Sequence, residues 1–157
     1  MKIKTAVVAL ASAAVVAGGV GAEQAGAASS HTTQHRSKTI SFTAVRKTMS
    51  HVDAAPSGPS AGDSTYIGGH IAKGNASGYT TAQCVAVTSE DGGIAQCQVD
   101  LVLRHGTLVT LGTSVGDEPR IKLAVVGGTG RYARATGSGS LLPTKSGSNV
   151  VLHVHSR

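Results

Sequence analysis

A glycine-rich stretch that follows a short apolar run constrains this chain most. Residues 123–126 read Leu-Ala-Val-Val, a run that predicts a β-strand. Gly127, Gly128, Thr129 and Gly130 follow directly. Because glycine has no Cβ, it adopts the positive φ angles that a tight reversal of the chain requires. The stretch therefore predicts a strand, a glycine turn and a second strand.

The same glycines also fit a nucleotide-binding pattern, since residues 128–133 read G-x-G-x-x-A. That mechanism needs a helix directly after the turn and an acidic residue about 20 positions later. The following Ala-Thr-Gly-Ser-Gly-Ser segment, residues 135–140, is a poor helix former, and no Asp or Glu occurs after Glu118. These observations exclude a dinucleotide-binding domain.

The beginning of the chain predicts export. A basic start (residues 1–4) precedes a small, apolar run (residues 6–20) and an Ala-Gly-Ala cleavage site at 25–27. The apolar run is short and interrupted by glycines, which disfavours a membrane anchor. We therefore expect a secreted, extracellular protein with no membrane association after cleavage. The expected organisation is a signal peptide at 1–28, a disordered leader at 29–38 and one β-barrel domain at 39–157.

The charge of the exported chain is moderately basic. Removing Lys2, Lys4 and Glu23 from 14 basic and 8 acidic residues leaves 12 and 7, a net charge of +5. The charges are scattered along the sequence, and the chain has one Phe, three Tyr and no Trp. Nucleic-acid-binding proteins usually cluster basic residues beside stacking aromatic side chains, so no nucleic-acid partner is expected.

The chain contains eight strand-like segments separated by Gly, Pro, Asn and Asp turns. With 21 glycines and no helical periodicity, the composition favours an all-β domain. Eight strands are enough to close a barrel and leave no free edge. The expected strands are residues 39–45, with an extension over 46–53, then 64–73, 79–88, 94–104, 107–115, 121–126, 132–142 and 149–155.

Cys84 and Cys97 are the only cysteines. In an exported domain two cysteines most often form one disulfide, and these lie on neighbouring strands of a predicted hairpin. Cys97 shares the expected interior face with Val99, Leu101 and Leu103, whereas alternation from Val85 and Val87 places Cys84 on the opposite face from those valines. Either Val85 points outward or a bulge intervenes. A catalytic thiol would need an activating base, and none is evident nearby.

The polar residues expected inside the barrel are few. Tyr66 and His70 lie on one face of the 64–73 strand, Arg46 lies at the end of the first strand, and Tyr132 follows the glycine turn. Tyr or His can act as acid or base, and Arg can stabilise an anion. Tyr66, His70 and Arg46 are therefore weak catalytic candidates, and Tyr66, His70 and Tyr132 are ligand-binding candidates. Packing or surface positions are the competing interpretation for each.

Two histidine pairs have a spacing that metal sites use. His31 and His35 lie in the expected leader, and His153 and His155 lie two apart on one strand face. No other ligand-type residue accompanies them, and solvated positions are the simpler interpretation. We expect no metal site.

The glycine hairpin resembles a known family. Residues 125–132, Val-Val-Gly-Gly-Thr-Gly-Arg-Tyr, with Ala135 and Gly137, are similar to the signature hairpin of the allene oxide cyclase and dirigent proteins. Residues 60–63, Ser-Ala-Gly-Asp, followed by Tyr66, are similar to the family's Gly-Asp element before its second strand. The similarity extends over residues 40–155. It implies an eight-stranded antiparallel β-barrel, a small apolar ligand, no cofactor, and homo-oligomers like the dimers and trimers of the family.

The catalytic residues of that family do not carry over. Allene oxide cyclases use an acidic residue on the first strand, but residues 39–48 contain none. Many dirigent proteins have Ala-Arg-Gly after the glycine turn, whereas this chain has Ala135-Thr136-Gly137. The resemblance therefore predicts a secreted small-molecule-binding barrel, either a cyclase, isomerase or stereocontrol protein that acts by confinement, or a non-catalytic protein that binds a ligand or acts through its surface with a filled barrel. The sequence does not decide whether it is an enzyme.

Overall fold

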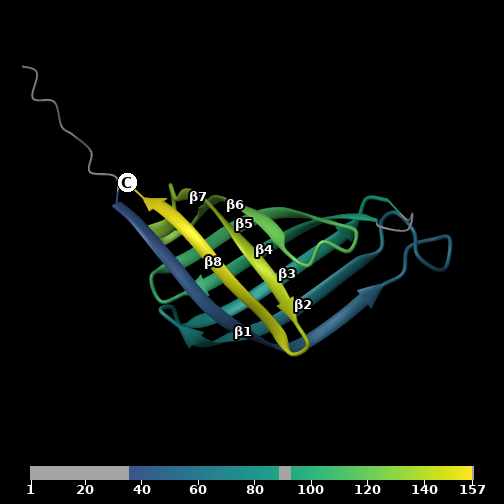
Figure 1. The fold of residues 1–157 in the computed structure, drawn as a ribbon, viewed down its shortest axis with the longest axis horizontal. Helices are drawn as coiled ribbons and strands as arrows, with labels where there is room; N and C mark the ends of the chain where they lie inside the picture. The colour runs from purple at the N-terminus through teal and green to yellow at the C-terminus, as the bar shows by residue number, and fades with distance from the viewer. Residues whose placement is uncertain (1–35, 89–92, 157) are drawn as a thin grey trace, which may run out of the picture. The chain divides into compact units, whose positions relative to one another are not determined.

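The chain forms a closed barrel of eight antiparallel strands in a computed structural model, which describes residues 36–88 and 93–156. Each strand pairs with the next along the sequence, and β8 returns to pair with β1 (Figure 1). The predicted fold class, a single eight-stranded antiparallel barrel, is therefore confirmed. The elements are β1 (Arg36–Val52), β2 (Ser64–Gly74), β3 (Gly78–Ala86), β4 (Ile94–Leu103), β5 (Gly106–Val115), β6 (Ile121–Gly128), η1 (Gly130–Tyr132), β7 (Thr136–Thr144) and β8 (Gly147–Ser156).

β1 is longer than the sequence pattern indicates. It begins at Arg36, three residues before the expected start at Thr39, and runs on to Val52. The early start has a physical reason, since Arg36 and Lys38 pair with Ser156 and Val154 of β8. Residues 36–38 thus belong to the barrel and not to a leader. The remainder of the expected leader and the expected signal peptide lie outside the described residues.

The glycine hairpin contains a 3₁₀ turn that was not expected. β6 ends at Gly128, η1 follows, and β7 begins at Thr136, so Tyr132 does not start the seventh strand. A Cβ at Gly128 would overlap the carbonyl oxygen of Thr107 on β5, so only glycine fits this close approach of two backbones. The backbone N–H of Arg131 donates to the His105 carbonyl oxygen, which fixes the turn against the β4–β5 connection. A 3₁₀ turn in place of an α-helix agrees with the exclusion of a nucleotide-binding unit.

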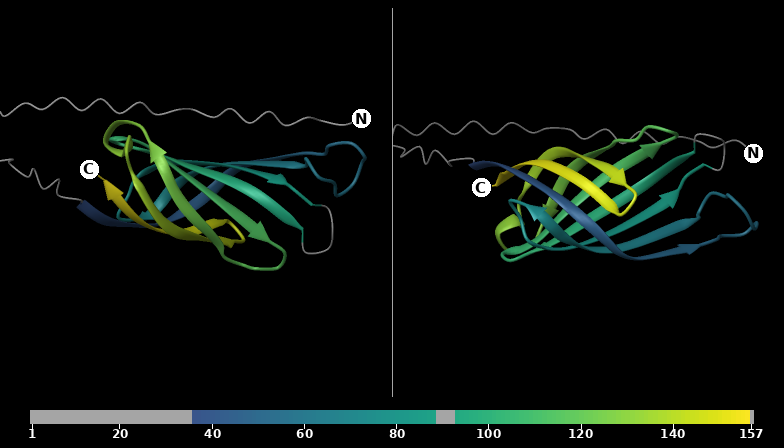
Figure 2. Two further views of the ribbon diagram at one scale, coloured as in Figure 1. Left: turned by 90° about the horizontal axis from the view of Figure 1, so that it is seen from above. Right: turned by 60° about the horizontal axis from the view of Figure 1, so that its bottom comes forward.

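The two ends of the barrel differ. We call the end with the start of β1, η1 and the end of β8 the closed end, and the opposite end, with the 53–63 loop and the β7–β8 turn, the open end (Figures 1 and 2). Apolar side chains fill the barrel toward the closed end, where Ile40, Leu101, Leu108 and Leu152 are at most 1% exposed. The expected interior face of β4 is confirmed, since Cys97, Val99 and Leu101 are buried and Leu103 packs against the core.

Candidate functional site

A cavity of about 240 Å³ occupies the interior of the barrel at its open end. Its walls are mostly apolar, with aliphatic side chains from several strands and the sulfur atoms of both cysteines. The barrel is therefore filled in one half and hollow in the other. The lining residues are Ala44, Arg46, Ile67, Gly69, Thr80, Ala82, Cys84, Cys97, Val99, Ile121, Leu141, Pro143, Thr144, Gly147, Ser148 and Val150.

The predicted disulfide is present and forms part of the cavity wall. Cys84 and Cys97 are direct partners on β3 and β4, with a Cα–Cα distance of 4.1 Å. The β3–β4 register runs without a shift, so the bulge considered from the sequence is absent between these strands. Instead, Val85 lies in a hollow on the outer wall while Cys84 faces the cavity. The face of β3 is set by Ala82 and Cys84 and not by the valines.

Arg46 lies at the rim of the cavity, as the alternation of β1 predicts. Its Nη2 donates a hydrogen bond of 3.0 Å to the carbonyl oxygen of Lys145 in the β7–β8 turn, and its Nη1 lies 3.5 Å from Met49 Sδ. Arg46 is the one charged side chain among the described residues that line the cavity. The remaining polar groups of the lining come from hydroxyls, among them the half-buried Thr80 and Ser148. Arg46 is therefore the natural partner for negative charge on a bound molecule.

Tyr66 and His70 do not lie inside the barrel, so their expected interior position is wrong. On β2 the inward residues are Ile67, Gly69 and Ile71, which line the cavity or belong to the core. Tyr66 is 42% exposed, and its hydroxyl accepts a hydrogen bond from Gln83 Nε2 on the outer wall. His70 pairs with Tyr79, which is 67% exposed, so both face outward. Alternation separates two faces but does not tell which one is buried.

Tyr132 lies at the closed end, far along the barrel axis from the rim that carries Arg46. It is half-buried in η1 and packs against the core. It lines a separate hollow with Arg131 and the start of β1. The structure therefore does not bring Tyr132 together with the other predicted site residues.

Two residues at the mouth escaped prediction because of a bulge in β1. Arg46 pairs with Gly69 and Thr48 with Gly68, so Lys47 is an extra residue and the faces of β1 exchange beyond it. As a result Met49 and His51 continue the inward face. The Nδ1 atom of His51 lies 3.3 Å from Thr65 Oγ1. Strict alternation, which assigns even-numbered residues of this strand to the interior, cannot reveal such a switch.

His51 borders a vestibule of about 380 Å³ beside the cavity. Thr65, Ala86 and Ala95 line it on the inward faces of their strands, and Cys84 lines both the vestibule and the cavity. The only imidazole near the cavity among the described lining residues is thus that of His51. The full lining is His51, Asp53, Gly58, Pro59, Asp63, Thr65, Cys84, Ala86 and Ala95.

Asp63 holds the loop that forms one side of this vestibule. Its carboxylate accepts hydrogen bonds of 2.9 Å from the backbone N–H groups of Ala54 and Ser60 and from the Ser60 hydroxyl. The Ser60 N–H and then the Ala54 N–H hold the pKa of Asp63 below its ordinary value, and the positive charge of His51 adds to this. The Ser-Ala-Gly-Asp element is therefore a structural clamp, with its acceptor capacity largely used within the loop.

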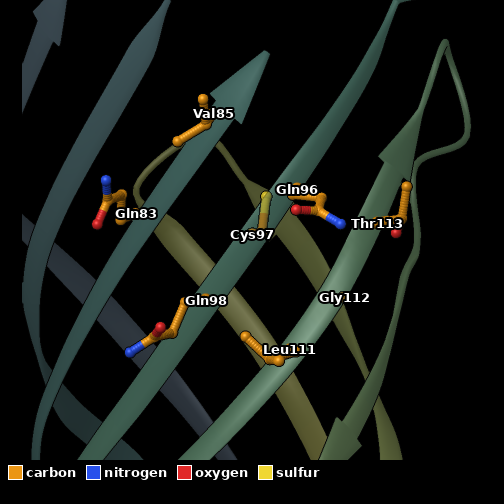
Figure 3. A pocket seen from close by; sticks show the side chains of 8 residues that line it. All are labelled: Gln83, Val85, Gln96, Cys97, Gln98, Leu111, Gly112 and Thr113. Carbon is orange, nitrogen blue, oxygen red and sulfur yellow. The ribbon is translucent and has the colours of Figure 1, made fainter. Parts of the chain in front are cut away.

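A second hollow, of about 410 Å³, lies on the outer wall over β3, β4 and β5 (Figure 3). Gln83, Gln96, Gln98 and Thr113 give it amide and hydroxyl groups, and Leu111 gives an exposed aliphatic surface. None of its described lining residues has an ionisable side chain, because Cys97 is bonded to Cys84. The interior cavity, which is enclosed by apolar groups, has the character of a small-molecule site.

Among residues 36–88 and 93–156, no group of three or more His, Cys, Asp or Glu side chains is placed to hold a metal ion. His153 and His155 are exposed on β8, and the Nδ1 atom of His153 lies 3.2 Å from Thr39 Oγ1. His31 and His35 lie outside the described residues. No helix in the described part of the chain has the length and apolar character needed to cross a bilayer.

No protein-family model matches the sequence, and no curated protein matches it significantly. Solved structures match the fold. A pyocyanin demethylase superposes with a TM-score of 0.64 at 17% identity, over 76% of this chain and 99% of that one. An exo-specific intermolecular Diels-Alderase gives 0.63 at 15% identity, over 78% and 98%. A pterocarpan synthase dirigent protein gives 0.63 at 14% identity, over 78% and 89%.

At these identities the likeness establishes the fold, and the site has to be argued from this chain's own residues. The closed eight-stranded barrel and the glycine hairpin agree with the expectation that the sequence resemblance raised. The chain has the same barrel fold as the Diels-Alderase and the dirigent protein.

Proposed function

We propose that this protein binds a small, mostly apolar molecule in the cavity at the open end of its barrel and directs a ring closure or coupling of that molecule by confinement. The main observation that supports this function is the half-filled interior of the barrel. Packed residues such as Leu101 and Leu152 form a floor beneath a hollow of about 240 Å³. A rigid apolar enclosure favours one folded conformation of a flexible substrate over the others.

The size of the cavity limits the ligand. Typical small-molecule pockets measure about 300–1,000 Å³, and this cavity lies just below that range. A ligand with one or two rings is therefore the expected occupant. A longer molecule would extend toward the mouth and meet the vestibule with His51.

Arg46 gives the site its electrostatic character. With Lys145 and Met49 as its partners, the guanidinium has further N–H donors for a ligand oxygen. A positive group fixed at the rim of an apolar cavity stabilises negative charge that develops on a carbonyl or enol oxygen. We therefore propose a substrate with an apolar body and one oxygen-bearing end that faces Arg46.

Export is part of the proposal. The disulfide fits an oxidising compartment, and the first 28 residues have the pattern of a secretory signal. The shared fold of a Diels-Alderase and a dirigent protein supports a role in ring formation or stereocontrol.

One observation favours a second candidate, a binding protein without catalysis. The described residues that line the cavity include no carboxylate, imidazole or phenol. General acid–base chemistry would then depend on His51 at the mouth or on the substrate itself. The catalyst and the binding protein are distinguished by the small molecules that the protein releases after it is isolated from its producing cells. If the protein is a catalyst, the released molecule is a product, and adding the protein to the precursor of that product speeds its formation. If the protein only binds, the released molecule is a ligand that the protein leaves unchanged.

The binding itself is tested with 2-naphthoate, a two-ring fluorescent probe with one carboxylate. We expect saturable binding to the wild-type protein. Ala82→Leu, which places a larger side chain in the cavity, is expected to weaken it at least about tenfold, because the added side chain takes up volume that the ligand needs in a hollow of only about 240 Å³. Val85→Leu, on the outer face of the same strand, serves as the matched control and should leave binding unchanged.

The role of Arg46 is tested with the same probe. Arg46→Gln is expected to weaken the binding of 2-naphthoate but not that of neutral 2-methylnaphthalene, because only the carboxylate contacts the guanidinium.

Equal binding of 2-naphthoate to the wild-type protein and to Ala82→Leu would contradict the proposed site.

A further inference from the structure

The closed end of the barrel carries six of the eleven described basic residues, and the other five lie toward the open end. In the sequence they are scattered, but the strand ends and turns bring six of them to the same end. The described acidic residues lie elsewhere, with Asp53, Asp63, Asp117 and Glu118 in loops at the open end and Asp100 within β4. The six basic residues are Arg36, Lys38, Lys73, Arg104, Arg131 and Arg134.

Three of these cations surround one groove. Arg36, Lys38 and Ile40 alternate along β1 and therefore share a face, which is the inward face because Ile40 is 1% exposed. The start of β1 and the end of β8 extend together beyond the packed core, paired at Arg36–Ser156 and Lys38–Val154 (Figure 1). This ribbon and η1, which carries Arg131, enclose a hollow of about 590 Å³.

The floor of the groove is apolar. Ile40 and Val154 are buried beneath it, and the half-buried Tyr132 forms part of the wall. The groove shares no lining residue with the cavity at the open end. Leu101, Leu108 and Leu152, all fully buried, fill the barrel between the two. The groove is a separate site with cations around an apolar base.

We propose that this groove binds a small amphipathic anion, an aromatic body that carries a phosphate or sulfonate group. Guanidinium groups recognise such oxyanions through paired hydrogen bonds, and Arg36 and Arg131 lie on different walls of the same hollow. The aromatic body contacts Tyr132 and the aliphatic floor. The volume lies within the range of about 300–1,000 Å³ that is usual for small-molecule sites.

This inference is independent of the proposed function, because it concerns different residues at the other end of the barrel. The test is a titration with 2-naphthyl phosphate, followed through the backbone amide signals of the ¹⁵N-labelled protein. We expect the signals of Lys38, Arg131 and Tyr132 to shift together and to saturate. Thr80 and Ala82, which line the open-end cavity, report on that cavity in the same spectra.

The double variant Arg36→Gln/Arg131→Gln removes the two guanidinium groups and leaves the floor intact. It is expected to weaken 2-naphthyl phosphate at least about tenfold, the size typical for loss of a hydrogen bond to a charged group. Arg120→Gln, in the exposed loop before β6 at the open end, is the control and should leave this binding unchanged, since Arg120 lines neither the groove nor the cavity. The amide spectrum of each variant shows whether the barrel still folds.

Two further probes separate the parts of the ligand. Neutral 2-naphthol should not shift the groove signals at the concentrations that saturate with 2-naphthyl phosphate, and inorganic phosphate should bind at least about tenfold more weakly because it does not use the apolar floor. Shifts confined to Thr80 and Ala82, equal binding by the double variant, equal binding of inorganic phosphate, or no binding at all would each overturn the proposal.

Discussion

Thr110 shows how single polar residues fit into this small apolar barrel. It is fully buried on β5, and its hydroxyl donates a hydrogen bond of 2.9 Å to the Val99 carbonyl oxygen on β4. Thr110→Val keeps the shape and removes this bond. We expect a loss of about 1 kcal/mol in the free energy of unfolding. Urea unfolding measures it, with Thr113→Val on the exposed face of β5 as the control. Equal stability of Thr110→Val and the wild-type protein would contradict the assigned bond.

Asp63 gives a prediction that depends on pH. Its pKa in the folded protein lies below the ordinary value of 3.8, so the ionised group contributes stability that is fully present above that value. The contribution is lost as the pH falls through the lower folded-state pKa. We therefore expect Asp63→Asn to be less stable than the wild-type protein at neutral pH. The difference should shrink below about pH 4.

Urea unfolding between neutral and acidic pH measures this difference. Asp117→Asn, in the exposed loop after β5, is the matched control for removal of one carboxylate at the open end. If the free energy of unfolding of Asp63→Asn stays below that of the wild-type protein by a constant amount down to about pH 2, the lowered pKa of Asp63 does not contribute to stability.

At the level of single residues, the sequence predicted some positions and missed others for clear reasons. Arg46 was placed correctly because β1 alternates without interruption from Ile40 to that point. Tyr66 and His70 were placed on the wrong face because the inward face of β2 carries Gly69 between Ile67 and Ile71. A glycine on the inward face weakens the hydrophobic signal by which the two faces are told apart.

The disulfide is the element that joins the two strands of the cavity wall. It closes a loop with a sequence separation of 13. Breaking a disulfide that closes a loop of that size lowers the free energy of unfolding of the protein by about 3 kcal/mol. We expect Cys84→Ala/Cys97→Ala to lose about 2–4 kcal/mol. Urea unfolding of the oxidised wild-type protein, the reduced wild-type protein and the double variant measures this. Reduced wild-type protein should resemble the variant, and equal stability of all three would contradict the prediction.

Strands were easier to predict than the features that interrupt them. All eight strand segments follow from alternation and turn residues, and their ends differ from expectation by a few residues. The extra Lys47 in β1 and the 3₁₀ turn η1 were not predicted, because a bulge and a turn type depend on the partner strand. The bulge matters for the site, since it directs Met49 and His51 inward.

At the scale of the whole molecule, closing the barrel creates properties that no segment has alone. One half is packed and the other is hollow, although the strands that form the two halves are the same. Six of the eleven described basic residues, spread through the sequence, lie at the closed end, and Arg36 and Lys38 reach the groove there because β1 pairs with β8. Composition and periodicity are local, so they predicted a barrel but neither its cavity nor its distribution of charge.

The central claim is that the open end of the barrel encloses a cavity that takes a small apolar molecule. A crystal structure under xenon pressure tests it most directly, because apolar cavities bind xenon. The account predicts a xenon atom bounded by Ala82, Val99 and Val150, and its loss in Ala82→Leu. No xenon inside the barrel, or the same xenon site in both proteins, would contradict the claim.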